Sequence, residues 1–116
     1  MNEIPLAFVY SFEYNQGMND LRRTPEFTAW FNGLRDETAQ ARIALRLRHA
    51  AMGHFGDCEA AGGGVSEMRI HYGPGYRVYF AREGAVLYLL LLGGDKQSQR
   101  RDIARAKAMW KRLKGE

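Results

Sequence analysis

The segment from residue 62 to residue 96 constrains the fold more than any other part of the chain. It reads GGGVSEMRIHYGPGYRVYFAREGAVLYLLLLGGDK. Two stretches of alternating polar and apolar residues meet at Gly73-Pro74-Gly75, and a nearly uninterrupted apolar stretch follows a second turn at Glu83-Gly84. Such alternation is typical of half-buried strands, and short glycine-containing turns are typical of hairpins. The segment therefore predicts a three-stranded antiparallel meander.

The alternation sorts the side chains of the first two strands onto two faces, because successive residues of a strand point to opposite sides. The apolar face takes Met68, Ile70, Tyr76, Val78 and Phe80. The polar face takes Glu67, Arg69, His71, Arg77 and Tyr79. A three-residue loop would make Tyr72 the partner of Tyr76, which sets His71 opposite Arg77 and Arg69 opposite Tyr79. We take this polar face as the candidate site.

Length and composition favour one domain and are compatible with an acidic partner. The chain has 116 residues and a formal net charge of +4, and its isoelectric point is near 9.5. A basic chain of this size suits nucleic acid or an acidic protein segment. The single cysteine, Cys58, excludes an internal disulfide. We find no signal-peptide pattern and no apolar run near the ~18 residues that span a bilayer, so we expect a cytoplasmic protein with no membrane partner.

The first 17 residues differ in composition from the rest. They contain none of the 17 lysines and arginines of the chain, and Met18 follows them. We interpret residues 1–17 as an N-terminal extension ahead of a single domain at residues 18–116. The alternative is an apolar strand or arm, since the aromatic and branched residues between Leu6 and Phe12 suit pairing with a sheet edge.

Two helices are predicted before the meander, after a short strand at residues 19–23. Thr24-Pro25-Glu26 is typical of a helix start, with a threonine cap, a proline in the first turn and an acid after it. Its apolar stripe consists of Phe27, Trp30, Phe31 and Leu34. Asp36 caps a second helix that runs to about Met52.

The second helix carries a basic stripe formed by Arg42, Arg46 and His49. A solvated helix face is one interpretation of this stripe, and a phosphate contact is the other. We expect residues 54–64 to form a glycine-rich connection. Its three consecutive glycines, residues 62–64, fit no phosphate-loop pattern, and we expect no nucleotide site there.

A final helix is predicted after Lys96, capped by Asp95 or Ser98. Its apolar stripe consists of Ile103, Ala106, Trp110 and Leu113. Its other faces carry Arg100, Arg101, Arg105, Lys107, Lys111, Arg112 and Lys114. Cations in the last turn interact favourably with the helix dipole. The other basic residues of the helix indicate a partner. The fold class is α+β, and we expect helices on one face of an antiparallel sheet and an open second face.

The open polar face suits a phosphodiester. Arg69 and Arg77, with Lys96 at the end of the third strand, would pair with phosphate oxygens and neutralise a pentacoordinate transition state. His71 and Glu67 would exchange protons. We see no metal ligand set and expect no cofactor, so the substrate must bring its own nucleophile, as the RNA 2′-hydroxyl does. The alternative is that Glu67 and Arg69 merely neutralise each other on exposed strands.

Four runs of the sequence closely resemble the addiction-module killer proteins, the HigB-like members of the RelE/ParE toxin superfamily. They are GD at 56–57, GVSEMRIHYGPGYRVYF at 64–80, LLLGGDKQSQ at 90–99 and DI at 102–103. The Thr24-Pro25-Glu26-Phe27 start also fits the opening helix of that family. The resemblance covers about residues 19–113 and leaves residues 1–17 outside.

The resemblance implies a toxin neutralised by a helix-turn-helix antitoxin, with operator DNA bound only through that antitoxin. In RelE-type members it implies a ribosome-dependent endoribonuclease that cuts mRNA. Arg77 matches the strand arginine that contacts the scissile phosphate, and Arg69 and Lys96 match nearby basic positions. The predicted catalytic residues are therefore Glu67, Arg69, His71, Arg77 and Lys96. The predicted substrate-binding residues are Arg42, Arg46, Tyr79 and Gln99.

One position departs from the pattern of the RelE-type enzymes. Six residues beyond the basic position they carry a catalytic tyrosine, and this chain has Asp102. Tyr79, His71 or another group then does that work, or the chemistry differs. The alternatives are a ParE-like binder of DNA gyrase and an inactive homologue that binds only its antitoxin.

Overall fold

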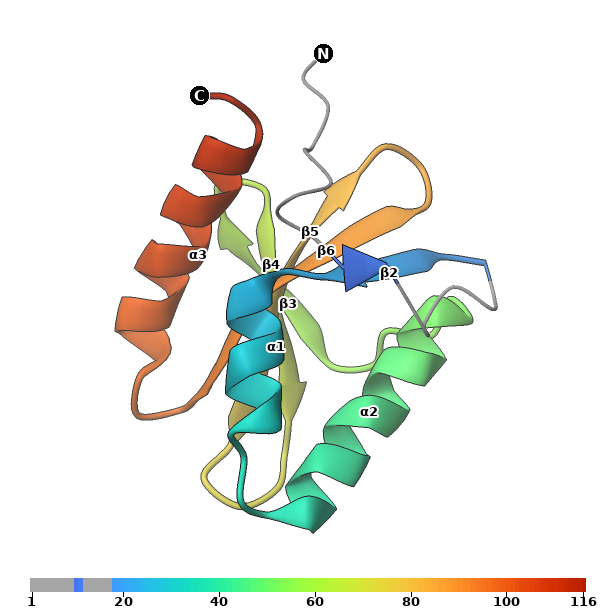
Figure 1. Cartoon of the computed structure of the whole chain (residues 1–116), viewed down its shortest axis with the longest axis vertical. Helices are drawn as coiled ribbons and strands as arrows, with labels where there is room; N and C mark the ends of the chain where they lie inside the picture. The colour runs from blue at the N-terminus through green and yellow to red at the C-terminus, as the bar shows by residue number, and fades with distance from the viewer. Residues whose placement is uncertain (1–9, 12–17) are drawn as a thin grey trace.

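The computed structural model describes residues 10–11 and 18–116, which form a six-stranded sheet and three helices (Figure 1). The elements in chain order are β1 (Tyr10–Ser11), β2 (Asp20–Arg23), α1 (Pro25–Asn32), α2 (Glu37–Ala51), β3 (Cys58–Gly62), β4 (Val65–Ile70), β5 (Tyr76–Glu83), β6 (Leu87–Asp95) and α3 (Gln99–Leu113). The predicted α+β class is confirmed, with two helices before the meander and one after it.

The strands lie in the order β1-β2-β6-β5-β4-β3. The predicted antiparallel meander is confirmed as β4-β5-β6. The predicted purely antiparallel sheet is wrong, because β2 pairs with β6 in parallel. Residues 54–64 are also more than a connection, since they contain β3, which pairs antiparallel with β4. The sheet is therefore mixed, and the meander is its centre.

The predicted pairing between β4 and β5 is wrong by two residues. Arg69 lies opposite Arg77, and Glu67 lies opposite Tyr79. The connecting turn takes residues 71–75 rather than three, since Gly75 N donates to Tyr72 O at 3.1 Å. A shift of two residues preserves the faces, because side chains alternate with a period of two. The polar and apolar sets therefore remain as predicted.

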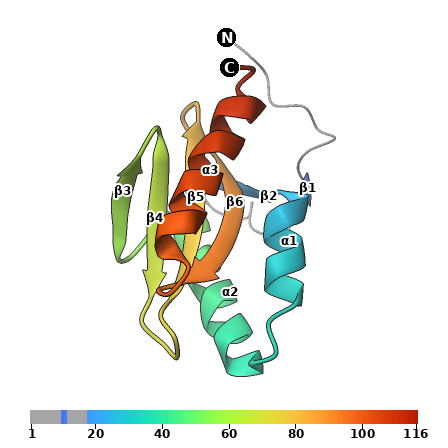
Figure 2. The ribbon, with the colours of Figure 1, turned by 90° about the vertical axis from the view of Figure 1, so that its left-hand side faces the viewer.

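Helices cover both faces of the sheet, so the predicted open face is wrong. Helices α1 and α2 pack on one face and α3 on the other (Figure 2). Strand β6 supplies apolar residues to both cores, with Leu90 in the first and Leu89 and Leu91 in the second. Side chains such as Ala106 and Trp110 of α3 bury the second face. The polar residues of that face include Glu67, and Arg69 and Arg77, which pair nearer the β4–β5 turn.

The helix starts follow the predicted capping residues. Thr24 accepts a hydrogen bond from Phe27 N at 3.0 Å and donates one to Leu91 O at 2.7 Å, which ties the start of α1 to β6. Asp36 accepts from Ala39 N at 3.1 Å and caps α2. The first helical turn of α3 follows Ser98, whose side chain makes no capping bond.

Two consecutive glycines of β6 let helices approach from opposite sides. A Cβ at Gly93 would overlap the Trp30 ring of α1, and a Cβ at Gly94 would overlap the Asp102 carboxylate of α3. The glycines at residues 62–64 lie against Lys107 and Trp110 of α3. The glycine runs are therefore packing positions.

Strand β1 pairs antiparallel with β2 at the sheet edge, with Tyr10 opposite Arg23 and Ser11 opposite Arg22. The other residues of the interpreted N-terminal extension, 1–9 and 12–17, lie outside the described residues. The extension therefore stays a prediction.

Candidate functional site

Glu67 stands at the centre of a polar cluster on the α3 face of the sheet. It is only 3% exposed. Its Oε2 accepts from Arg69 Nε at 2.9 Å, and its Oε1 accepts from Gln99 Nε2 at 2.7 Å. Arg77 Nε lies 3.9 Å from Oε1. One carboxylate thus joins β4, β5 and α3, and both of its oxygens are occupied.

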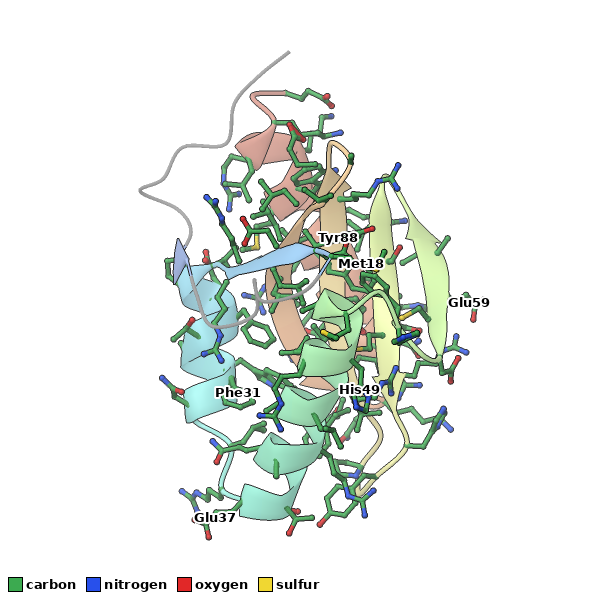
Figure 3. All side chains as sticks on the ribbon, turned by 90° about the vertical axis from the view of Figure 1, so that its right-hand side faces the viewer. Met18, Phe31, Glu37, His49, Glu59 and Tyr88 are labelled. Atoms are coloured by element: carbon green, nitrogen blue, oxygen red, sulfur yellow. The ribbon has the colours of Figure 1, made fainter. Side chains whose placement is uncertain are left out.

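Arg69 and Arg77 lie directly opposite each other on neighbouring strands. Like charges in this position repel, and Glu67 between them supplies the compensating charge. Arg69 also pairs with Glu59, which projects from β3 at the sheet edge (Figure 3). The hydrogen bond to Glu67, more than the charge of Glu59, raises the pKa of Arg69. The Arg69 guanidinium is therefore held by two carboxylates.

Arg77 is nearly enclosed at the end of the site that faces the β4–β5 turn. Its Nη1 donates to Gly75 O at 2.7 Å. Its buried Nε makes no hydrogen bond with the residues that the structure describes. The side chain is therefore fixed by the turn on one side and by Glu67 on the other.

Lys96 flanks the same turn from the end of β6. A Cβ at Gly75 would lie 2.9 Å from Arg77 Nη1 and 3.4 Å from Lys96 Cβ. Lys96 is exposed and has no ion-pair partner within residues 18–116. The structure therefore brings Arg69, Arg77 and Lys96 to one end of the sheet.

Tyr79 lies beneath this cluster and is fully buried. Its hydroxyl makes no hydrogen bond with the described residues. Burial, with the negative charges of Glu67 and Asp102, raises the pKa of Tyr79 well above its usual value. The predicted contact between Tyr79 and a substrate is contradicted, because the ring is closed off from solvent. Tyr79 instead belongs to the buried core between the sheet and α3.

His71 lies just beyond β4 and has a partner of its own. Its Nε2 is 2.5 Å from Oδ2 of Asp57, and its side chain is 72% exposed. The predicted exchange of protons with Glu67 is not supported, because Glu67 is bonded to Arg69 and Gln99 instead. The hydrogen bond with His71 is the main cause that lowers the pKa of Asp57.

The two arginines predicted to bind substrate from α2 have structural contacts. Arg46 Nη1 donates to Arg69 O at 2.6 Å, and Arg46 Nη2 donates to Phe55 O at 3.0 Å. Arg42 stacks over the Tyr72 ring at 4.6 Å. Arg46 thereby clamps α2 to β4, and neither the solvated-face interpretation nor the phosphate contact describes it. Gln99, the remaining predicted residue, joins the cluster through Glu67.

The sequence analysis missed Asp102 as part of the cluster. Its carboxylate is 2% exposed, packs on Gly94 and accepts from the Ser98 hydroxyl at 2.5 Å. Asp102 occupies the position at which the resemblance implies a tyrosine. A pocket of about 360 Å³ lies beside it and is lined by Asp95, Gln97, Ser98 and Arg101. Ser98 and Asp102 are one helical turn apart, which places both side chains on the same side of the chain, close to Gly94. This spacing was the sequence signal that could have indicated their contact.

Glu59 and Asp57 were missed as partners of Arg69 and His71. Glu59 lies in β3 and Asp57 directly precedes it. The sequence pattern did not predict this strand, so it did not indicate that these two carboxylates lie beside β4.

The described part of the chain contains neither a metal-ligand cluster nor a helix able to cross a membrane. No three or more His, Cys, Asp or Glu side chains gather there in a way that would hold a metal ion. None of its helices combines the length and the apolar character that crossing a membrane requires.

The chain is similar to a known bacterial protein. No protein-family model matches the chain. A Haemophilus influenzae protein, described as an uncharacterized protein, is 39% identical over 93 residues, which cover 80% of this chain and 94% of the relative. The chain therefore belongs to the same family as this Haemophilus influenzae protein.

Proposed function

We propose that the protein is the toxin of a type II toxin–antitoxin module and cleaves mRNA on the ribosome. The observation that carries the proposal is the cross-strand pair of Arg69 and Arg77, which ends beside the exposed Lys96, a residue with no ion-pair partner among residues 18–116. Two of these cations, Arg77 and Lys96, suit a phosphate group, since guanidinium and ammonium groups donate to its oxygens. The RelE/ParE-like sequence motif supports the same reading.

The cluster assigns different tasks to the three cations. Arg69 is occupied by Glu67 and Glu59, so it supports the site rather than the substrate. The small accessible part of Arg77, 11% of its side chain, and the ammonium of Lys96 would contact the scissile phosphate. Their charge would stabilise the additional negative charge of a pentacoordinate transition state.

The reaction needs no nucleophile from the protein. The RNA 2′-oxygen forms a bond to phosphorus while the bond from phosphorus to the 5′-oxygen breaks. The products are a 2′,3′-cyclic phosphate and a 5′-hydroxyl, with no co-reactant consumed. The proposed setting is the cytoplasm, and the proposed partners are translated mRNA and a helix-turn-helix antitoxin.

Arg77→Ala tests the proposal. We expect mRNA cleavage to fall by about 10²-fold or more, because a donor to the transition state is lost. Arg82→Ala is the matched control, since Arg82 is an exposed arginine on the same strand. Primer extension on a translated reporter, compared with the same message without a start codon, measures the cuts. Cleavage by the folded Arg77→Ala variant at the wild-type rate would contradict the proposal.

A non-enzymatic toxin that binds DNA gyrase is the second candidate. The enclosure of Glu67, Asp102 and Tyr79 favours it, because none of these groups is exposed to a substrate. Such a protein should induce a DNA-damage response and leave messages uncut. An inactive homologue that binds only its antitoxin should do neither.

A further inference from the structure

The proposed cleavage lacks a base among the groups of the central cluster. Glu67 and Asp102 are 3% and 2% exposed, and Tyr79 is fully buried. A general base must come within hydrogen-bond reach of the proton that it takes. A 2′-hydroxyl outside the sheet has no such access to these three groups. The base must therefore lie on the exposed rim.

His71 and Asp57 form a hydrogen-bonded pair on that rim. Glu67 and Arg69 alternate onto one face of β4, and His71 is the next residue of this alternation, just beyond the strand. Its Nε2 lies 2.5 Å from Asp57 Oδ2, and its ring is largely exposed. The imidazole is thus both fixed at one nitrogen and open to solvent.

The backbone fixes Asp57 relative to the arginine pair. Arg69 N donates to Asp57 O at 2.9 Å, and Arg46 Nη2 approaches the same oxygen at 3.4 Å. Asp57 is thereby attached to the strand that carries Arg69, and Arg46 braces it from α2. A histidine held by such a residue keeps a constant position relative to the phosphate site.

The charges around the pair favour an ionised Asp57. The bond to His71 lowers the pKa of Asp57 most, and the positive charges of Arg69 and Arg46 lower it further. An anionic carboxylate accepts from the Nε2–H of a neutral imidazole. This selects the tautomer that leaves Nδ1 free to accept a proton.

We propose that His71 is the general base of the cleavage and that Asp57 is its positioning residue. The inference rests on the proposed function. Nδ1 of His71 takes the proton of the 2′-hydroxyl as the 2′-oxygen bonds to phosphorus. The leaving 5′-oxygen takes a proton from water, and the imidazolium releases its proton to solvent, so the proton count is unchanged.

The test is single-turnover cleavage of mRNA on purified ribosomes, from about pH 5 to pH 8, where imidazoles titrate. The wild-type rate should fall as the pH falls, because a protonated imidazole cannot act as a base. His71→Gln should lower the rate constant by about 10²-fold or more and abolish this fall in rate at low pH, the acidic limb of the pH–rate profile. KM should change little. We expect His71→Gln to fold, because the side chain is largely exposed, and circular dichroism checks this.

Two further variants separate positioning from a merely structural role. Asp57→Asn removes the carboxylate that selects the Nε2–H tautomer of His71, so the rate constant should fall while KM changes little. His54→Gln replaces another exposed histidine and should leave the rate and profile unchanged.

The outcomes distinguish the two proposals. Cleavage by His71→Gln at the wild-type rate, or with the acidic limb intact, would overturn the inference and leave the proposed function standing. A rate constant for Asp57→Asn equal to that of the wild-type protein would overturn the role of Asp57. If the wild-type protein cuts no message on the ribosome, the proposed function falls and the inference falls with it.

Discussion

The two faces of the sheet bury different kinds of side chain. The face under α1 and α2 is apolar, with residues such as Phe27, Ile43 and Leu47 completely enclosed. The face under α3 has an apolar part around Trp110 but also buries Glu67, Arg77 and Asp102. Apolar burial stabilises without regard to direction, whereas a buried charge requires a partner in a defined geometry. The first face therefore secures the fold, and the second fixes the positions of functional groups.

Neighbouring residues of β4 illustrate the difference. Glu67 and Met68 are 3% and 1% exposed, yet they point to opposite faces. Met68 stabilises the fold because its apolar surface is removed from water and packs against its neighbours. Glu67 contributes only through the groups that it holds, because the desolvation of its charge opposes its attraction to the arginines. Equal burial thus has a different physical basis on each face.

Replacement of Glu67 should have the largest combined effect on stability and cleavage. Glu67→Gln leaves Arg69 and Arg77 opposed without the charge between them, and we expect a loss of about 3 kcal/mol in the free energy of unfolding. Cleavage should be lost as well, because the guanidiniums lose their alignment. Urea unfolding and the primer-extension assay measure the two effects.

Met68→Ala is the matched control on the other face. It should cost about 2 to 5 kcal/mol through the cavity that it leaves. The folded fraction should nevertheless cleave at the wild-type rate. A folded Glu67→Gln variant with normal cleavage would show that the buried charges of the α3 face serve stability alone.

The consecutive glycines of β6 give a smaller and more local test. Gly93→Ala would push Trp30 and α1 away, and Gly94→Ala would push Asp102 and α3 away. Each overlap should cost about 1 to 3 kcal/mol. Only Gly94→Ala should also reduce cleavage, because α3 carries Gln99, the partner of Glu67. Thermal unfolding and cleavage by the folded fraction compare the pair. An equal reduction of cleavage in both variants would contradict the division between the faces.

The sequence predicted correctly which side chains share a face of the central strands. An error of two residues in the pairing does not change the face of any side chain, because side chains alternate with a period of two. The true turn is two residues longer than expected, and Glu67, Arg69 and Arg77 still share a face. The helix starts at Thr24 and Asp36 were predictable because capping is local. Local rules thus account for most of the elements.

Long-range contacts account for what the sequence did not indicate. The parallel pairing of β2 with β6 joins segments more than sixty residues apart, and no local pattern encodes it. The unpredicted strand β3 concealed Glu59 and Asp57 as partners. Alternation alone placed Tyr79 on an accessible polar face. The sequence did not indicate that α3 covers this face and buries the ring. Each miss concerns which element packs against which.

Tyr79→Phe should have the smallest effect and tests that cover directly. The Tyr79 hydroxyl is buried without a hydrogen bond in the described structure, so its removal should change the free energy of unfolding by less than about 1 kcal/mol at neutral pH. The raised pKa of the folded state means that the wild-type protein loses stability as the pH rises above about 10, where the phenol of the unfolded chain ionises. The variant lacks this contribution and should gain relative stability there. Urea unfolding at neutral and alkaline pH measures the difference.

Cleavage by Tyr79→Phe at neutral pH should equal that of the wild-type protein, because the phenol is neutral and enclosed in both the resting site and the proposed reaction. A large loss of cleavage with unchanged stability would show that α3 moves aside and exposes Tyr79 to the substrate. In that case the α3 face would be a mobile cover over a second reactive group, and the contrast with the rigid apolar face would be sharper than the structure indicates.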